Sequence, residues 1–282
     1  MKKIIAMMLA LMLALTGIAV FTACEGEETP AETTTEEANK NETPTTDAPT
    51  TEEQTTEAPA PQVLKMATNA YFQPYEYYDG DKIVGIDAEI AAAIAEKLGM
   101  TLEIVDMEFD SIITAVNAGS VDFGMAGMTI TEDRLKEVDF SISYANGKQV
   151  IIVKEDSAIT TADDLFAEGA AYKVGVQLGT TGDIYATGDF GAEKVSTYSN
   201  GNDAVLALLS GSVDCVIIDN EPAKALVAAN EGLKILETEY TNEDYAICVK
   251  KGNSELLAKI DQAIKDLTAE GKIDEIIDKY IK

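Results

Sequence analysis

The tetrapeptide Gly119-Ser120-Val121-Asp122 recurs 92 residues later as Gly211-Ser212-Val213-Asp214. Each copy follows a stretch with helical apolar periodicity and opens a short apolar strand that runs into a loop. Chance repetition is the alternative, because Gly-Ser is a common turn between a helix and a strand. The shared context favours two similar α/β lobes, each built around the strand that this motif opens.

The stretches on either side of both motifs alternate between strand and helix patterns. In the first half we expect strands at 63–68, 102–105 and 121–125 and helices at 87–98 and 110–119, with Asp87 and Asp110 as N-caps. In the second half we expect strands at 173–177 and 213–218 and a helix at 202–209. Alternating elements of this kind indicate βαβ units and a mostly parallel sheet in each half.

Four loops follow the expected strands, after Met66, Met125, Gln177 and Ile218. In parallel α/β sheets, ligands bind beyond the carboxyl ends of the strands. Two lobes that face each other would bring all four loops to one cleft. We therefore expect the binding site between the lobes.

Arg134 is the single arginine of the 282 residues, whereas lysine occurs 20 times. Its planar guanidinium matches a carboxylate or a phosphate with two parallel N–H groups, which lysine does not offer. An ordinary surface arginine is the alternative. Thr131 is expected to cap a short helix, which places Arg134 one turn in, close to the loop 126–129. That loop has a hydroxyl and free carbonyls, so the segment is suited to both charged ends of a small zwitterion.

Composition excludes several classes of function. The chain has no histidine, which rules out histidine-based acid–base catalysis, Ser-His and Cys-His nucleophiles and most zinc sites. Residues 62–282 contain 18 basic and 39 acidic residues, a net charge of −21, which argues against nucleic acid as a partner. Cys215 and Cys248 both lie in apolar strand-like runs, so we favour buried free thiols over a disulfide between them.

The N-terminal stretch predicts export. Lys2 and Lys3 precede an apolar run from residue 4 to residue 21, which is typical of a signal peptide over 1–23; a transmembrane anchor is the alternative. Cys24 follows Phe-Thr-Ala, an arrangement that resembles the lipobox of bacterial lipoproteins, so we expect a lipid such as palmitate on Cys24. From there to residue 61 the chain is rich in Glu, Thr, Ala and Pro and should form a disordered acidic stalk.

Several short motifs follow one another along residues 62–282. They are Phe72-Gln73-Pro74-Tyr75-Glu76, Gly85-Ile86-Asp87, Phe109-Asp110 with Gly119 to Asp122, Met128 to Arg134, Asp139-Phe140-Ser141, Gly179-Thr180-Thr181 and Val213-Asp214 to Asp219. In this order and spacing, they resemble the family 3 solute-binding proteins of bacterial amino-acid ABC importers.

The resemblance implies an α/β fold of two Rossmann-like lobes joined by a two-segment hinge, the type II fold of periplasmic binding proteins. We place the crossovers at 144–148 and 241–245, with lobe 1 formed by 62–145 plus 246–282 and lobe 2 by 146–245. Closure about the hinge would trap the ligand, and an ABC transporter permease would recognise the closed form. The implied protein is a monomer, held by its lipid at the extracytoplasmic face of the cell membrane.

The resemblance also implies a ligand site. Arg134 would pair with an α-carboxylate, helped by the backbone N–H groups of Thr180 and Thr181. Asp219, the Thr129 hydroxyl and the Gly127 carbonyl would hold the α-ammonium. The remaining predicted site residues are Ala126, the pocket walls Phe72 and Phe109, and the side-chain contacts Asn69 and Gln177. Each has a purely structural alternative: Phe72 and Phe109 as core aromatics, Thr181 and Asp219 as helix caps, Thr129 as a turn residue.

Asn69 and Gln177 are neutral at positions where glutamine-binding relatives carry charged residues. An acidic ligand side chain would need a second cation, and no second arginine exists, so Lys148 is the candidate for that role. We therefore expect an uncharged, polar L-amino acid as the ligand, and no cofactor or metal. Two alternatives remain: an enzyme of the same fold, such as a dehydratase, with Glu76 or Glu221 as its acid, and a sensor that binds an amino acid without transport.

Overall fold

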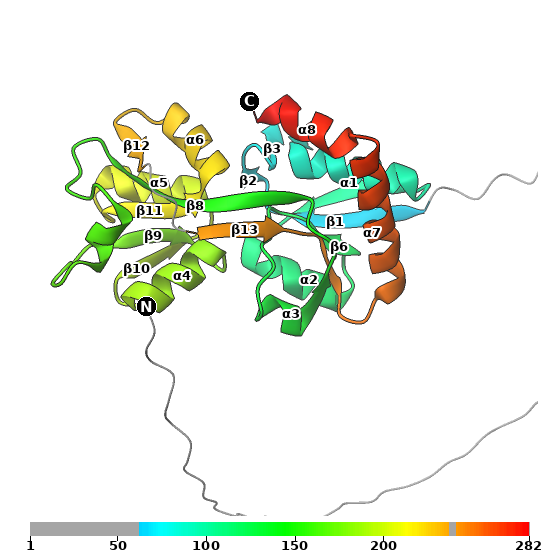
Figure 1. Ribbon diagram of the computed structural model, residues 1–282, viewed down its shortest axis with the longest axis horizontal. Coiled ribbons are helices and arrows are strands. Elements are labelled where there is room, and N and C mark those ends of the chain that lie inside the picture. Colours follow the sequence, from blue (N-terminus) through cyan, green and yellow to red (C-terminus); the bar gives the residue numbers. More distant parts are fainter. Residues whose placement is uncertain (1–61, 237–240, 282) are drawn as a thin grey trace, which may run out of the picture. The chain divides into compact units, whose positions relative to one another are not determined.

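The computed structural model describes residues 62–236 and 241–281. The predicted signal peptide, the lipidation site Cys24 and the acidic stalk all lie outside the described residues. The described part contains two large β-sheets, each covered by helices, and two long strands run from one sheet toward the other (Figure 1). We call the half that contains the chain's first strand lobe 1 and the other half lobe 2.

Lobe 1 is built from both ends of the described chain. Its sheet has the order β5-β1-β6-β14-β7, in which β1 is parallel to β5 and β6, whereas β14 is antiparallel to β6 and β7. The sheet strands are β1 (Val63–Thr68), β5 (Thr101–Asp106), β6 (Phe123–Gly124), β7 (Val138–Phe140) and β14 (Cys248–Lys250). A small separate sheet comprises β2 (Tyr71–Phe72), β3 (Glu76–Asp79) and β4 (Lys82–Val84). The helices are α1 (Ile86–Lys97), the 3-10 helix η1 (Phe109–Ser111), α2 (Ile112–Ala118), α3 (Arg134–Glu137), α7 (Ser254–Ala269) and α8 (Lys272–Tyr280).

Lobe 2 repeats this plan. Its sheet has the order β10-β9-β11-β8-β12, with β9 parallel to β10 and β11, and β8 antiparallel to its neighbours β11, β12 and β13. The strands are β8 (Ala145–Lys154), β9 (Val174–Gln177), β10 (Val195–Tyr198), β11 (Cys215–Asp219), β12 (Leu233–Ile235) and β13 (Thr241–Tyr245). The helices are the 3-10 helix η2 (Ala162–Phe166), α4 (Thr181–Phe190), α5 (Gly201–Ser210) and α6 (Asn220–Ala229).

The two crossovers expected at 144–148 and 241–245 are strands that pair with each other. β13 lies antiparallel to the first half of β8, with Thr241 opposite Gln149 and Tyr245 opposite Ala145. Figure 1 shows both strands running between the lobes. The two-segment hinge is therefore a two-stranded ribbon, and residues from both strands reach the space between the lobes.

The expectation of mostly parallel sheets is confirmed for strand direction. Among the described strands, β14 alone runs against the others in the lobe 1 sheet. In the lobe 2 sheet, β8 alone runs against the others. The strand expected over 121–125 contains just two paired residues, Phe123 and Gly124. Gly124 is required there: a Cβ at this position would lie 2.5 Å from Ile112 and 2.7 Å from the Cys248 sulfur.

Strand β8 shows why lobe 2 folds as a layered sheet. Its apolar run has no polar alternation, which is typical of a strand buried on both faces. Val150 and Ile152 belong to the cluster on one face, whereas Ile151 and Val153 belong to the cluster on the other. All four side chains are at most 4% exposed. Burial of such side chains stabilises the fold by about 1.5–3 kcal/mol each.

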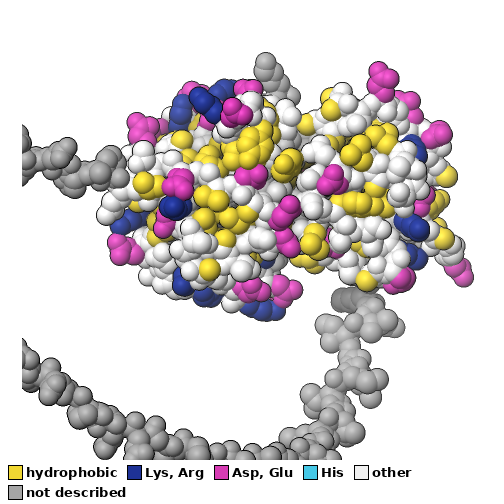
Figure 2. Space-filling model, turned by 180° about the vertical axis from the view of Figure 1, so that it is seen from behind, with side chains coloured by type: hydrophobic (Ala, Val, Ile, Leu, Met, Phe, Trp, Pro, Cys, Tyr) yellow, Lys and Arg dark blue, Asp and Glu magenta, His cyan; other side chains and the backbone are white. Residues whose placement is uncertain are grey.

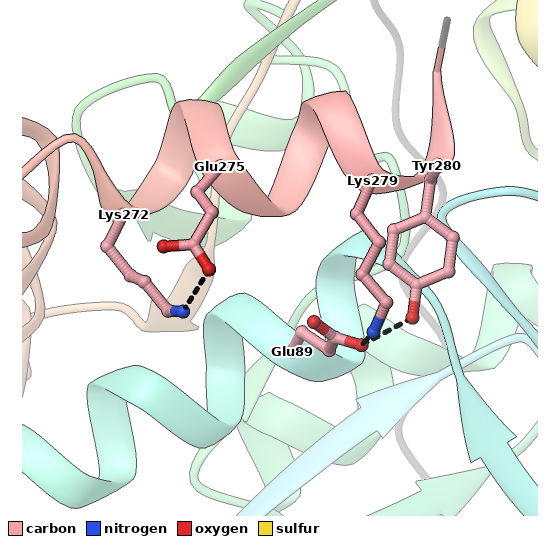
Figure 3. Close-up of polar contacts among 5 residues, drawn as sticks. All are labelled: Glu89, Lys272, Glu275, Lys279 and Tyr280. Atoms are coloured by element: carbon pink, nitrogen blue, oxygen red, sulfur yellow. Dashed lines mark hydrogen bonds and ion pairs between the residues drawn. The ribbon is translucent and has the colours of Figure 1, made fainter.

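The C-terminal helices α7 and α8 return to lobe 1 and pack against α1. Figure 3 shows Lys279 and Tyr280 of α8 at Glu89 of α1, where the Tyr280 hydroxyl donates a 2.5 Å hydrogen bond to the Glu89 carboxylate. Polar contacts this exposed contribute at most about 1 kcal/mol. The buried face of α8, with Ile273 and Ile276, supplies the larger part of the attachment.

The two described cysteines are free and buried, as expected. Cys215 lies in β11 of lobe 2 and Cys248 in β14 of lobe 1, so each belongs to a different sheet. Burial raises the pKa of each thiol to about 12, which keeps both uncharged at physiological pH.

On the face of the molecule that Figure 2 shows, acidic side chains are scattered rather than gathered in one patch. Lysines lie among them, and several of these charges form ion pairs on single helices, such as Lys259 with Glu255. An acidic surface of this kind disfavours nucleic acid as a partner.

Candidate ligand-binding site

A pocket between the lobes gathers the residues that the sequence singled out. All eleven predicted site residues line it, together with Glu76: Asn69, Phe72, Phe109, Ala126, Gly127, Thr129, Arg134, Gln177, Thr180, Thr181 and Asp219. They come from the segments that end or follow β1, β6, β9 and β11, which include the small strands β2 and β3 and the first residues of α3 and α4, and from η1. The placement agrees with the expectation for parallel α/β sheets. The role of each residue toward a ligand stays a prediction.

Arg134 is 7% exposed and held on two sides. Its Nη1 donates to the Thr129 carbonyl at 2.7 Å, and its Nη2 donates to the Gly179 carbonyl of lobe 2 at 3.0 Å. The guanidinium carbon also lies 5.2 Å from the centre of the Phe109 ring, which fixes the plane of the fork. The guanidinium N–H groups not used in these two bonds are suited to an anion in the pocket.

The short helix around Arg134 begins later than expected. Helix α3 starts at Arg134 itself, and the Thr131 hydroxyl accepts a 3.2 Å hydrogen bond from the Arg134 backbone N–H. Asp133, and not Thr131, is therefore the N-cap of α3, while the Thr131 hydroxyl still holds the first helical N–H. The preceding residue Ile130 is held by the hinge, since its N–H donates to the Asp244 carbonyl.

The start of helix α4 differs from the expected arrangement in one respect. Thr180 is the N-cap, and its hydroxyl accepts from the Asp183 N–H at 3.3 Å, so the cap alternative applies to Thr180 rather than to Thr181. The Thr180 N–H donates to the Gln177 carbonyl at 3.3 Å, which leaves Thr181 as the better placed backbone donor of the two predicted ones. The first turn of α4 faces the pocket with the positive end of the helix dipole.

Asp219 ends β11 and precedes α6. The alternative that its side chain caps this helix is wrong, because the carboxylate makes no capping hydrogen bond. Instead it accepts from Gln149 Nε2 at 2.8 Å and from the Tyr245 hydroxyl. Both donors come from the hinge strands. Burial, and then the nearby Glu243, raise the pKa of Asp219 to about 7.

The far end of the pocket is formed by two amides. Gln177 Nε2 donates to Asn69 Oδ1 across the lobes at 2.9 Å and to the Ser199 carbonyl at 3.1 Å. Asn69 Nδ2 donates to the Met107 carbonyl at 2.9 Å. These side chains are buried and have fixed orientations. Lys148, the candidate for an acidic ligand side chain, lines other cavities and not this pocket.

The two aromatic walls differ. Phe72 is 8% exposed and belongs both to the pocket and to a hydrophobic core cluster, so its structural and binding roles coexist. A Cβ on Gly127 would lie 2.7 Å from its ring, which explains the glycine, and Gly127 also has φ = +53°. Phe109 is half-buried and stacks on Arg134.

Behind Gly127 lies a buried acid pair that the sequence reading did not foresee. Asp87 was expected to cap α1; Gly85 occupies the N-cap position instead, and Asp87 points inward. Asp87 Oδ2 accepts from the Gly127 N–H and from the Tyr144 hydroxyl, both at 2.8 Å. Glu76 is fully buried beside it; burial, then the charge of Asp87, raise the pKa of Glu76 well above its usual range. The loop that carries Gly127 is thus held by Asp87, and the raised pKa of Glu76 favours its neutral acid beside that carboxylate.

Sequence reasoning missed Glu243. It lies on β13, is 6% exposed, and accepts hydrogen bonds from Thr129, Thr181 and Gln149. The segment 241–245 was read as a connection, so the side-chain directions of a strand were not applied to it. The available signal was that Glu243 lies two residues before Tyr245, which begins an apolar run, because residues i and i+2 of a strand share one face.

The model of the bacterial extracellular solute-binding proteins, family 3, matches residues 64–282. The chain belongs to this family. The solute-binding protein resembles the arginine-binding extracellular protein ArtP of Bacillus subtilis, with 34% identity over 223 residues that cover 77% of this chain and 85% of the relative.

Solved structures of similar proteins share the fold. An ancestral arginine-binding protein bound to arginine has a TM-score of 0.72 and 42% identity, covering 78% of this chain and 98% of that protein. The ancestral arginine-binding protein bound to glutamine has a TM-score of 0.73 and 41% identity, covering 78% and 97%. The predicted α/β fold of two lobes joined by a two-segment hinge is thereby confirmed.

Proposed function

We propose that this solute-binding protein captures an uncharged polar L-amino acid, with L-glutamine as the first candidate, and presents it to the permease of an ABC importer. The observation that carries the proposal is the pair Arg134 and Asp219, two buried groups of opposite charge in one pocket. A zwitterion satisfies both groups, because each buried charge requires a partner.

The preference for a neutral side chain rests on the amides at the end of the pocket. Asn69 and Gln177 present carbonyl oxygens and N–H groups but no formal charge, and Glu76 has a raised pKa that favours its neutral acid. An amide side chain of the ligand both donates and accepts, so it complements this lining. Similar ancestral proteins are solved with glutamine bound and with arginine bound, and several relatives bear the name of arginine-binding proteins, so the choice of glutamine rests on the amide lining.

Isothermal titration of the full chain with L-glutamine, L-arginine, L-histidine and L-glutamate tests this proposal. We expect saturable binding of L-glutamine, and a ligand at 100 times its dissociation constant should stabilise the protein by about 2.7 kcal/mol in a thermal-shift assay. Tight binding of L-arginine or L-glutamate with none of neutral amino acids would contradict the neutral pocket. Binding of none of the four would contradict amino-acid capture by this site.

We further propose that the protein is a lipid-anchored monomer outside the cytoplasm, with residues 1–23 removed, a lipid on Cys24 and the stalk 24–61 between the lipid and the lobes. The domain boundaries at 145–146 and 245–246 belong to the same proposal. Among the described residues, no helix combines the length and the apolarity that crossing a membrane requires. Expression of the full chain with Cys24→Ala should release the protein from bacterial membranes, whereas Cys215→Ala should leave it attached; equal membrane retention of both variants would contradict the anchor.

A further inference from the structure

Glu243 occupies a position at which hinge and both lobes meet. It belongs to β13, and the loop beside it is bound to that strand: the Ile130 N–H donates to the Asp244 carbonyl at 3.1 Å, and the Ala246 N–H donates to the Met128 carbonyl at 3.0 Å. Thr129 is therefore aligned with the strand, opposite Tyr245. The Glu243 side chain extends from this strand to groups that line the ligand pocket.

A single oxygen of Glu243 accepts three hydrogen bonds. The Thr129 hydroxyl of lobe 1 donates to Oε2 at 2.8 Å, the Thr181 hydroxyl of lobe 2 donates at 2.9 Å, and Gln149 Nε2 donates at 3.1 Å. A carboxylate oxygen has no hydrogen to give, so the hydrogens of both hydroxyls must point at Glu243. This fixes two rotors that would otherwise turn freely.

The direction of these hydroxyls decides what the pocket can bind. A threonine hydroxyl has one hydrogen and two lone pairs. Since the hydrogen of Thr129 is committed to Glu243, the hydroxyl offers the pocket lone pairs alone. Gln149 donates to Asp219 as well as to Glu243, so the carboxylate at the same end of the pocket is oriented by the same group. This end therefore presents acceptors and no hydroxyl donor.

We propose that Glu243 is a positioning residue for recognition of the ligand's α-ammonium group: by taking the hydroxyl hydrogens of Thr129 and Thr181, it turns the pocket into a set of acceptors that fits an ammonium. This inference rests on the proposed function, because it names a residue by which the pocket distinguishes an amino acid from the corresponding α-hydroxy or α-keto acid. An ammonium group has three N–H donors and complements Asp219 and the Thr129 oxygen. An α-hydroxy acid has one donor at that position and an α-keto acid has none.

The test compares two ligands on one protein. The wild-type full chain is first titrated with L-glutamine and with L-arginine. The amino acid that binds more tightly is then compared with its analogue that has a hydroxyl in place of the α-ammonium. The dissociation constant of the hydroxy analogue divided by that of the amino acid measures selection for the amino group. In Glu243→Gln the group that faces Thr129 is either a neutral amide oxygen or an NH2 donor, so the charge-assisted bond that holds the hydroxyl hydrogen away from the pocket is lost. We expect this ratio to fall by about tenfold or more, because a charge-assisted contact is lost for the amino acid alone.

Asp244→Asn is the matched control, because Asp244 is an exposed acid on the same strand and the substitution makes the same change of charge. It should leave the ratio unchanged. A purely structural role of Glu243 would weaken both ligands equally, and an unchanged ratio in Glu243→Gln would overturn the proposal. Failure of wild type to bind either amino acid would instead overturn the proposed function, and this inference with it.

Thr129 variants keep the proposal testable if Glu243→Gln does not fold. Thr129→Ser retains the hydroxyl and should retain the selectivity ratio, whereas Thr129→Val removes the acceptor and should lower the ratio by about tenfold. In a folded double variant, Glu243→Gln should add little to Thr129→Val, because both act through the same oxygen. Full additivity, or a ratio unaffected by Thr129→Val, would overturn the proposal.

Discussion

The Nη2 atom of Arg134 lies 3.0 Å from the carbonyl oxygen of Gly179, so a side chain of lobe 1 is hydrogen-bonded to the backbone of lobe 2. The same guanidinium donates to Thr129 of its own lobe. One planar group thus links the two lobes and, in our proposal, also holds the ligand carboxylate. Its two roles depend on several N–H groups fixed in a plane.

Replacement of the planar guanidinium by a lysine ammonium should therefore weaken ligand binding. We expect Arg134→Lys to keep the fold but weaken amino-acid binding by more than about tenfold, because an ammonium group cannot serve Thr129, Gly179 and a ligand carboxylate together. Isothermal titration measures the change, and Lys136→Met, which alters an exposed charge two residues away, is the control. Unchanged affinity in Arg134→Lys would refute the carboxylate assignment.

The affinity for an amino acid should fall at acid pH. The pKa of Asp219 is raised to about 7 by burial and Glu243, and the carboxylate must be ionised to hold an ammonium. Below pH 7, binding must expel a proton, so the dissociation constant should rise about tenfold for each pH unit. Titrations between about pH 5 and about pH 8 measure this slope. Asp219→Asn should bind more weakly and lose the slope; a slope that persists in that variant would assign the proton to another group.

The stability of the ligand-free protein should rise at acid pH, whereas the affinity for the ligand falls. Asp87 and Asp219 have pKa values raised from 3.8 to about 6 and about 7, so the folded state holds their protons more tightly than the unfolded state does. Their contribution to stability is complete below about pH 3.8 and is lost as the pH rises through 6 and 7. Acids with lowered pKa, such as Asp139, are already ionised across this window.

We therefore expect the melting temperature without ligand to be several degrees higher near pH 5 than near pH 8. Calorimetry of wild type and Asp87→Asn checks this, because the variant should lose part of the pH dependence. A melting temperature that rises from pH 5 to pH 8 would contradict the assignment of raised pKa values to these buried acids.

The hinge ribbon contains a tight contact. A Cβ at Gly147 of β8 would overlap the phenol of Tyr245, whose hydroxyl donates to Asp219. Gly147→Ala should therefore destabilise the protein by about 1–3 kcal/mol and displace Tyr245 from Asp219. Gly188→Ala is the control: its Cβ would meet no atom within 4 Å, and alanine favours the helix α4. Urea denaturation compares the two, and equal stability would show that the ribbon can relax around the added methyl group.

A change at Gln177 should shift ligand preference. Its amide donates to Asn69 and to the Ser199 carbonyl, and a carboxylate in Gln177→Glu would face both oxygens without a hydrogen to give. A guanidinium side chain supplies the missing donors. We expect the variant to bind L-glutamine about tenfold more weakly and to gain preference for L-arginine over L-glutamine. Parallel loss of affinity for both ligands would place Gln177 outside the side-chain pocket.

Much of the architecture followed from the sequence for physical reasons. The repeated Gly-Ser-Val-Asp motif marks equivalent helix-to-strand turns, and Gly119 and Gly211 both adopt positive φ at the ends of α2 and α5. Arg134 was conspicuous as a single residue of its type, and the rule that ligands bind at strand ends brought Asn69, Gln177 and Asp219 to the same pocket. These features are local, so the sequence alone reveals them.

The parts that were missed depend on contacts between distant segments. Asp87 resembles an N-cap locally, but Gly127 and Tyr144, far along the chain, draw it inward. Glu243 looks like one more acid in an acidic chain until β13 aligns it with Thr129 and Thr181. The single reversed strand of each described sheet, β14 or β8, likewise exists because the chain crosses between the lobes through the hinge. No short window of sequence contains that information.

The discontinuity of lobe 1 also sets an order in which the molecule can be completed. Lobe 2 comes from one uninterrupted stretch between β8 and β13, so it can fold while the rest of the chain is still emerging from the ribosome or the export channel. Lobe 1 lacks β14 in the middle of its sheet, and the helices α7 and α8 on its outside, until the last residues arrive. A chain that ended before Cys248 would therefore contain one finished lobe and an open sheet that exposes the unpaired edge of β6.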